Sequence, residues 1–243
     1  MHVNNETGTL NPISDISSIV HRSGGVIHCD AVQSTGYYDL KTIVGVVDLV
    51  TLSAHKFGGP KGAGILFVRS GVDLDPFIAG GAQERRRRAG TENVAAIAGL
   101  SKALSLAQLD PWLRQGRLRG LRDYLSARLE AALGSQVRVT TPSEDSAPHI
   151  LHVLFLDERG AGLDGEMLLL GLDMAGVYVS SGSACSSGAV EPSHVLTAMG
   201  IPPAMSRGAI RFSLGSSTSQ EDIDEAVDRL GQVVGQHSRM GTP

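Results

Sequence analysis

Three short runs rich in β-branched and other apolar residues, separated by glycine or polar breaks, constrain the first part of the chain. The runs are GVIHCD at residues 25–30, DLVTLS at residues 48–53 and GILFV at residues 64–68, and each reads as a strand. Residues 31–47 are long enough for the crossover between two parallel strands, although Gly36 and Gly45 weaken a continuous helix there. The glycine-rich turn at residues 58–64 suits a short antiparallel return. The pattern predicts an α/β fold with a mostly parallel sheet.

The sequence pattern changes at Asp110-Pro111. Aspartate is a good helix cap, and proline suits the first helical position. Leucines then recur at three- and four-residue steps from Leu118 to Leu133, and Gly134 follows as a stop, which predicts one amphipathic helix. Later runs predict strands at residues 149–156, 177–180 and 209–214, a helix at 166–176, and a final helix that opens with a TSQE capping box at 218–221. We therefore expect two domains, residues 1–110 and a smaller α+β domain at residues 111–243.

The charge balance argues against a protein that attracts nucleic acid or anionic lipid. The 243 residues hold 21 Lys and Arg against 25 Asp and Glu, a net charge of −4, and the basic run is Arg85 to Arg88. No stretch reaches the ~18 consecutive apolar residues of a membrane span. The first residues lack the basic-then-apolar order of a signal peptide. We expect a cytoplasmic protein without a nucleic-acid or membrane partner.

Two cysteines, Cys29 and Cys185, lie far apart in the sequence and form no C-x-x-C pair. The sequence thus predicts neither a disulfide framework nor a structural zinc site. The histidines lack the spacing of metal ligands, so no metal is expected. Cys29 lies inside an apolar strand and is expected to be a packed core residue.

The strongest local signal is SAHKFGGPKG at residues 53–62, which places Ser53, His55 and Lys56 just beyond the carboxyl end of a buried strand. Ligands of open α/β sheets bind at that edge. A partly desolvated lysine there can serve as an amine nucleophile, and the neighbouring hydroxyl and imidazole can hold a phosphate. The alternative is a solvated lysine in a glycine turn.

Asp30 ends the preceding strand, so strand adjacency brings its carboxylate to the same edge as Lys56. If a ligand with a ring nitrogen binds at this edge, a carboxylate that faces the nitrogen keeps it protonated. Gln33 lies three residues further on and can donate to a phenolic oxygen of the same ring. The other interpretation is that Asp30 and Gln33 cap the following helix, and the two roles can coexist.

Five blocks of sequence carry a resemblance that covers essentially the whole chain. The blocks are NNETG at residues 4–8, HCDAVQ at 28–33, SAHKFGGPKG at 53–62, QERxxRAGTEN at 83–93 and SSGSAC at 180–185. In order and spacing they resemble the cysteine desulfurases, which are pyridoxal-phosphate enzymes of the class V aminotransferase fold (fold type I). The resemblance implies that residues 1–110 are the remainder of a large cofactor-binding domain.

The resemblance also implies a role for each matching residue toward pyridoxal 5'-phosphate. Lys56 matches the lysine that binds the cofactor covalently, Asp30 the partner of the pyridine nitrogen, and Gln33 the neighbour of the phenolic oxygen. Ser53 and His55 match ligands of the phosphate.

Four further residues acquire roles from the same resemblance. Thr91 matches a threonine that reaches a phosphate across the interface of a homodimer. Asn5 and Arg211 match the pair that holds the substrate carboxylate, for which a guanidinium is a natural bidentate receptor. Cys185 matches the thiol that attacks the substrate sulfur, although a cysteine in such a loop can also be a buried small side chain.

The activity that the resemblance implies is the conversion of L-cysteine to L-alanine, with a persulfide left on Cys185 for an iron-sulfur scaffold protein or another thiol acceptor. Two alternatives are a non-catalytic remnant that acts only by interaction, and a selenocysteine lyase or other class V pyridoxal-phosphate enzyme. The family fold normally begins well upstream of Asn4. We therefore expect a chain without the family's early strands, its phosphate loop and its ring-stacking histidine, through an internal start or a truncated gene model.

Overall fold

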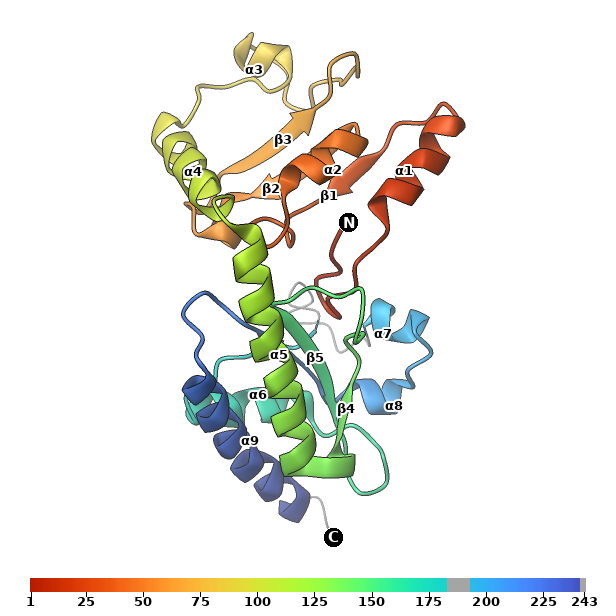
Figure 1. Cartoon of the computed structure of the whole chain (residues 1–243), viewed down its shortest axis with the longest axis vertical. Coiled ribbons are helices and arrows are strands. Elements are labelled where there is room, and N and C mark those ends of the chain that lie inside the picture. Colours follow the sequence, from red (N-terminus) through yellow and green to blue (C-terminus); the bar gives the residue numbers. More distant parts are fainter. Residues whose placement is uncertain (183–192, 241–243) are drawn as a thin grey trace. The chain divides into compact units, whose positions relative to one another are not determined.

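A computed structural model describes residues 1–182 and 193–240, the last four of them by their backbone only. Cys185 lies outside the described residues. The chain divides into two compact units, which we describe separately (Figure 1). Unit 1 comprises residues 1–3 and 11–113, and unit 2 comprises residues 4–10 and 114–243.

Unit 1 is a three-stranded sheet with helices packed beside it. Its elements are α1 (Ile13–Arg22), β1 (His28–Asp30), α2 (Leu40–Val46), β2 (Leu49–Ser53), the 3-10 helix η1 (Ala54–Phe57), β3 (Gly64–Val68), α3 (Gln83–Arg86) and α4 (Val94–Ala107). The strand order is β1-β2-β3; β1 and β2 are parallel, and β3 returns antiparallel to β2. The structure confirms the predicted crossover and the predicted short return.

The core of unit 1 lies on one face of this sheet. Val50 and Leu52 of β2 are buried there, together with Cys29 of β1 and apolar residues of α1 and α2. Cys29 is 1% exposed, which confirms the prediction of a packed core residue, and burial raises the pKa of its thiol. A buried thiol with a raised pKa is a poor nucleophile.

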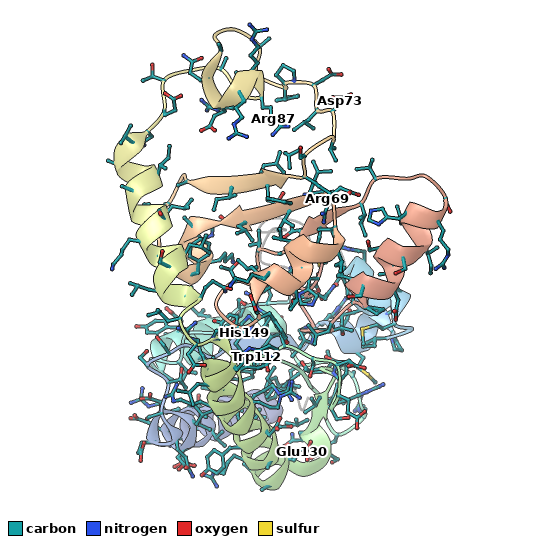
Figure 2. All side chains as sticks on the ribbon, turned by 45° about the horizontal axis from the view of Figure 1, so that its top comes forward. Arg69, Asp73, Arg87, Trp112, Glu130 and His149 are labelled. Atoms are coloured by element: carbon teal, nitrogen blue, oxygen red, sulfur yellow. The ribbon has the colours of Figure 1, made fainter. Side chains whose placement is uncertain are left out.

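A polar cluster fixes the amino ends of the two parallel strands. The Asp48 carboxylate accepts hydrogen bonds from the backbone N–H of Ile27 at 2.9 Å and from Nε2 of His21 at 2.8 Å. Arg69, which follows β3, lies 3.5 Å from the same carboxylate and donates to carbonyl oxygens at the end of α2 (Figure 2). The backbone hydrogen bond from Ile27, followed by the bond from His21, lowers the pKa of Asp48.

Unit 2 is a three-stranded antiparallel sheet with helices on both faces. Its elements are α5 (Pro111–Leu133), whose first residues belong to unit 1, the 3-10 helix η2 (Gly134–Gln136), β4 (Val137–Val139), β5 (Ile150–Phe155), α6 (Gly165–Met174), α7 (His194–Ala198), α8 (Pro203–Ser206), β6 (Ala209–Ser213) and α9 (Gln220–Met240). The strand order is β4-β5-β6. Figure 1 shows α5, α6 and α9 on one side of the sheet and α7 and α8 on the other.

The long amphipathic helix is confirmed as α5, whose Leu118, Leu125 and Leu129 are at most 2% exposed. On the opposite face of the sheet, Leu154 of β5 packs in a cluster with Leu196 and Ile201. Since every residue of β5 is buried, this strand is the centre of unit 2.

Residues 4–10, which we expected in the first domain, belong to unit 2. Their backbone is bonded to the segment before β5: Ala147 N–H donates to Gly8 at 2.7 Å, and Leu10 N–H donates to Asp145 at 2.7 Å. Gly8 has a φ of +77°, and a Cβ there would lie 3.1 Å from Cβ of Ile150. The turn therefore packs against β5 so closely that glycine is required.

Two local predictions are wrong. Residues 177–180 form no strand, because Val177 N–H is used in closing the end of α6 and the segment meets β6 only through a bridge between Ser180 and Arg211. The capping box lies one residue later than predicted: Ser219 and Asp222 exchange hydrogen bonds, each between one residue's side chain and the other's N–H. The Thr218 hydroxyl instead accepts from the N–H of Gly215.

We predict that Asp48→Asn lowers the free energy of unfolding at neutral pH. Because the pKa of the folded carboxyl is depressed, its stabilising contribution is present above the ordinary aspartate pKa of about 4 and is lost as pH falls through the folded pKa. Urea denaturation should therefore show a difference between wild type and variant that is largest near neutrality and shrinks in acid. Asp15→Asn, which alters an exposed carboxyl on α1, is the control. Equal losses at every pH for the two variants would contradict the prediction.

Candidate functional site

The carboxyl ends of β1 and β2 meet at one edge of the sheet of unit 1. Asp30, the last residue of β1, is in register with Thr51, and the strand β2 continues to Ser53. Lys56 lies on η1, which begins directly after β2 and is followed by Gly58 with a φ of +85°. Parallel pairing therefore places the carboxylate and the amine-bearing turn at the same edge, where open α/β sheets bind ligands.

The side chains at this edge are polar and partly accessible. Ser53 Oγ and His55 Nδ1 lie 3.0 Å apart, which makes a hydroxyl–imidazole pair, and both His55 and Lys56 are exposed. Oδ1 of Asp30 accepts a hydrogen bond from Val32 N–H at 2.9 Å, so this carboxylate does cap the turn that follows β1. That turn contains Gln33, which is half-buried.

Thr91 lies in the exposed loop between α3 and α4. Just before it, three consecutive residues adopt left-handed backbone conformations: Glu84, Arg85 and Arg86 have φ values of 48°, 57° and 65°. Such a conformation costs an L-residue roughly 1–2 kcal/mol. The arginine-rich segment before Thr91 is thus held in an unfavourable backbone conformation.

Asn5 and Arg211 come together within unit 2. Nη1 of Arg211 donates a hydrogen bond of 2.7 Å to the carbonyl oxygen of Asn5. The backbone of Arg211 is also paired with Ser180, through N–H donors at 2.7 and 3.2 Å. Arg211 is therefore held by two segments that lie far from it in the sequence, its side chain by Asn5 and its backbone by Ser180.

The sequence analysis assigned no role in the site to two further polar residues: His152, which lies opposite Arg211, and Glu6, which follows Asn5 in the chain. His152 lies opposite Arg211 in the β5–β6 register, is fully buried, and its Nδ1 lies 2.5 Å from the Thr140 hydroxyl. Burial, followed by the charge of Arg211, lowers the pKa of His152 to about 4. Glu6 is 3% exposed. A polar residue in the otherwise apolar run of β5 was the available signal for His152.

Comparisons with known proteins cover almost the whole chain. A family described as "Aminotransferase class-V" matches residues 1–226. The chain belongs to the class-V aminotransferase family. This match confirms the family and the fold that the five sequence blocks implied.

Individual proteins that the chain is similar to include cysteine desulfurases and NifS-like proteins. The cysteine desulfurase IscS of Dictyoglomus turgidum is 44% identical over 234 residues, which are 96% of this chain and 58% of that protein. A solved NifS-like protein superposes with a TM-score of 0.84 at 35% identity, covering 97% of this chain and 60% of the other. A structure titled "SspA in complex with cysteine" gives a TM-score of 0.67 at 29% identity, with 88% and 57% covered. The chain thus spans about 58% of the length of the curated relative.

Within the part of the chain that the structure describes, no helix is long and apolar enough to cross a membrane. Among the same residues, no group of three His, Cys, Asp or Glu side chains could hold a metal ion.

We predict that His152→Leu flattens the acid dependence of stability. An unfolded histidine titrates near pH 6.5, whereas His152 in the folded chain has a pKa of about 4, so the unfolded state takes up a proton that the folded state does not. Wild-type stability should therefore fall by up to about 3 kcal/mol between pH 6.5 and pH 4, and this part should vanish in the variant. Urea denaturation across this range measures it, with His194→Gln on the exposed start of α7 as control. Identical pH slopes for wild type and His152→Leu would refute it.

Proposed function

We propose that this chain carries the lysine, the substrate receptor and the thiol of a pyridoxal-phosphate-dependent cysteine desulfurase. The observation that carries the proposal is the pairing of Arg211 with Ser180, five residues before Cys185, next to the bond between Arg211 and Asn5. This pairing supports the proposal because Ser180 shortly precedes the cysteine that the resemblance assigns as the nucleophile, and Arg211 is the residue that it assigns to the substrate carboxylate. The likeness to cysteine desulfurases and to a protein solved with cysteine supports the choice of L-cysteine as substrate.

The donor set of unit 1 fits pyridoxal phosphate. Lys56 supplies an exposed amine for the aldehyde, and Asp30 supplies a carboxylate for the ring nitrogen at the same sheet edge. The adjacent pair of Ser53 and His55 suits a phosphate, and Gln33 suits the phenolic oxygen. The cofactor, when bound, supplies the electron sink, while the protein supplies orientation and electrostatics.

The residues of unit 2 bind the substrate and accept its sulfur. The Arg211 guanidinium, with Asn5 beside it, receives the carboxylate of L-cysteine, for which a planar fork of N–H donors is the best match. A bond then forms between the Cys185 sulfur and the substrate sulfur as the substrate's Cβ–S bond breaks. The alanine part keeps the electron pair and takes up a proton, and a persulfide remains on Cys185.

Covalent geometry supports this role for Cys185 although the residue lies outside the described part of the chain. Five residues of polypeptide span at most about 18 Å, which is the upper limit for the distance between Ser180 and Cys185 along the chain. The working unit in this proposal is a cytoplasmic homodimer in which Thr91 reaches the partner's cofactor phosphate. The persulfide passes to an iron-sulfur scaffold protein or another thiol acceptor.

The first test is the covalent attachment of the cofactor. The purified chain is incubated with pyridoxal phosphate, reduced with borohydride and digested, and the peptides are analysed by mass spectrometry. We expect the pyridoxyl mass on Lys56 and its loss in Lys56→Ala. Lys61→Ala, which removes an exposed lysine in the same glycine-rich turn, should retain the adduct. Absence of a specific adduct on Lys56 would favour a non-catalytic chain.

The second test separates sulfur transfer from cofactor binding. Cys185→Ala should abolish sulfide release from L-cysteine while the adduct on Lys56 persists, because the thiol takes no part in cofactor attachment. Cys29→Ala should release sulfide at close to the wild-type rate, since Cys29 is a core residue. Sulfide production by Cys185→Ala would overturn the assignment of the nucleophile.

A further inference from the structure

An arginine interrupts the apolar stripe of α5. Leu118, Leu125 and Leu129 are buried on one face of this helix. Arg122 lies four residues after the first leucine and three before the second, which places it on the same face. Its side chain is 4% exposed. Burying a guanidinium is unfavourable unless its N–H groups find acceptors, so the contacts of Arg122 must account for its position.

The guanidinium joins α5 to the segment before β5. Nε and Nη2 of Arg122 donate to Oδ1 of Asp123 at 3.0 and 2.8 Å, which orients the planar fork. Nη1 donates to the Ser146 hydroxyl at 2.6 Å and to the carbonyl oxygen of Ala147 at 2.9 Å. Ser146 and Ala147 are both 0% exposed, so water does not compete for these two acceptors. Arg122 therefore fixes the segment at residues 145–147.

The turn at residues 4–8 rests on this segment. Ala147 N–H donates to the carbonyl oxygen of Gly8, and the carbonyl oxygen of Asp145 accepts from Leu10 N–H, both at 2.7 Å. The two bonds lie on either side of Ser146, which the arginine holds. The position of the turn thus depends on a segment that is itself bonded to α5.

We propose that Arg122 is a positioning residue for the substrate carboxylate receptor. It holds the segment at residues 145–147, this segment holds the turn, and the turn presents the carbonyl oxygen of Asn5 to Nη1 of Arg211 at 2.7 Å. All of these residues belong to unit 2. The inference rests on the proposed function, in which Asn5 and Arg211 receive the carboxylate of L-cysteine. Loss of Arg122 then weakens substrate binding in the ground state and the transition state alike, which raises KM and leaves kcat unchanged.

Substitutions on α5 separate this role from the general stability of the helix. Arg122→Met keeps a long unbranched side chain in the buried stripe but has no donor for the segment before β5. Arg122→Lys keeps a cation that can donate to one acceptor but lacks the planar fork. Arg128→Met is the matched control, because Arg128 lies on the same helix and donates to Asp224 at 2.7 Å instead.

The first readout is the guanidinium of Arg211 itself and needs neither cofactor nor turnover. Nitrogen NMR of the isotope-labelled protein measures rotation about the Nε–Cζ bond, which the hydrogen bond to Asn5 slows. We expect this rotation to become about tenfold faster in Arg122→Met, the effect of weakening one charge-assisted hydrogen bond, and less so in Arg122→Lys. Arg128→Met should rotate as wild type does, and Arg211→Lys identifies the signal.

The second readout is turnover of L-cysteine by the full chain loaded with pyridoxal phosphate. We expect Arg122→Met to raise KM about tenfold and Arg122→Lys about threefold at unchanged kcat, with Arg128→Met at the wild-type values.

A lowered kcat at unchanged KM, or an unchanged rotation rate in a folded Arg122→Met, would overturn the inference. If Arg122→Met does not fold, the same two readouts on Arg122→Lys decide. If the wild-type chain shows no turnover, the proposed function fails, and the rotation of the Arg211 guanidinium alone decides whether Arg122 positions it.

Discussion

The pairing of β5 with β6 determines where the polar groups of unit 2 lie. Directly opposite residues of an antiparallel pair place their side chains on the same face, so the register between His152 and Arg211 brings an imidazole beside a guanidinium. Two residues further along β5, Leu154 packs on the same face against Leu196. One face of the sheet is thus apolar toward one end and polar around Arg211. A shift by one residue would turn the whole set to the other face.

In the sheet of unit 1, the amino ends and the carboxyl ends of the strands carry different sets of polar residues. Ile27 and Asp48 directly precede β1 and β2, and the hydrogen bond between them, with His21 and Arg69 around it, ties the amino ends together. The carboxyl ends of the strands are left to polar side chains. The structural polar contacts and the candidate site residues therefore lie at opposite ends of the strands of one small sheet.

The sequence predicted those elements whose pattern is local. The leucine period of α5 and the apolar runs of β2 and β5 each determine their own structure, and the five blocks identified the family. The strand predicted at residues 177–180 was wrong because valine and tyrosine are also compatible with an extended loop, which here meets β6 through one bridge. The capping box was misplaced because Thr218 and Ser219 are adjacent and chemically alike, and only tertiary contacts choose between them.

Residues whose position depends on distant segments could not be predicted in the same way. Nothing near Glu6 in the sequence indicates burial, since the partner of its carboxylate, Ser193, lies far from it in the sequence. The membership of residues 4–10 in unit 2 likewise depends on backbone bonds to residues 145–147. The roles of the site residues toward cofactor and substrate rest on the resemblance, because spacing alone does not distinguish a cofactor lysine from a solvated one.

The charge of Arg211 bears on the protonation of the buried histidine beside it. A protonated His152 would present a second cation beside Arg211. Burial and the guanidinium together lower the pKa of His152 to about 4, so the imidazole is neutral near pH 7. The guanidinium is then the cation of this pair, and it donates to the carbonyl oxygen of Asn5. Burial and the neighbouring charge, which keep the imidazole neutral, thus leave a single positive charge at this place in the β5–β6 pair.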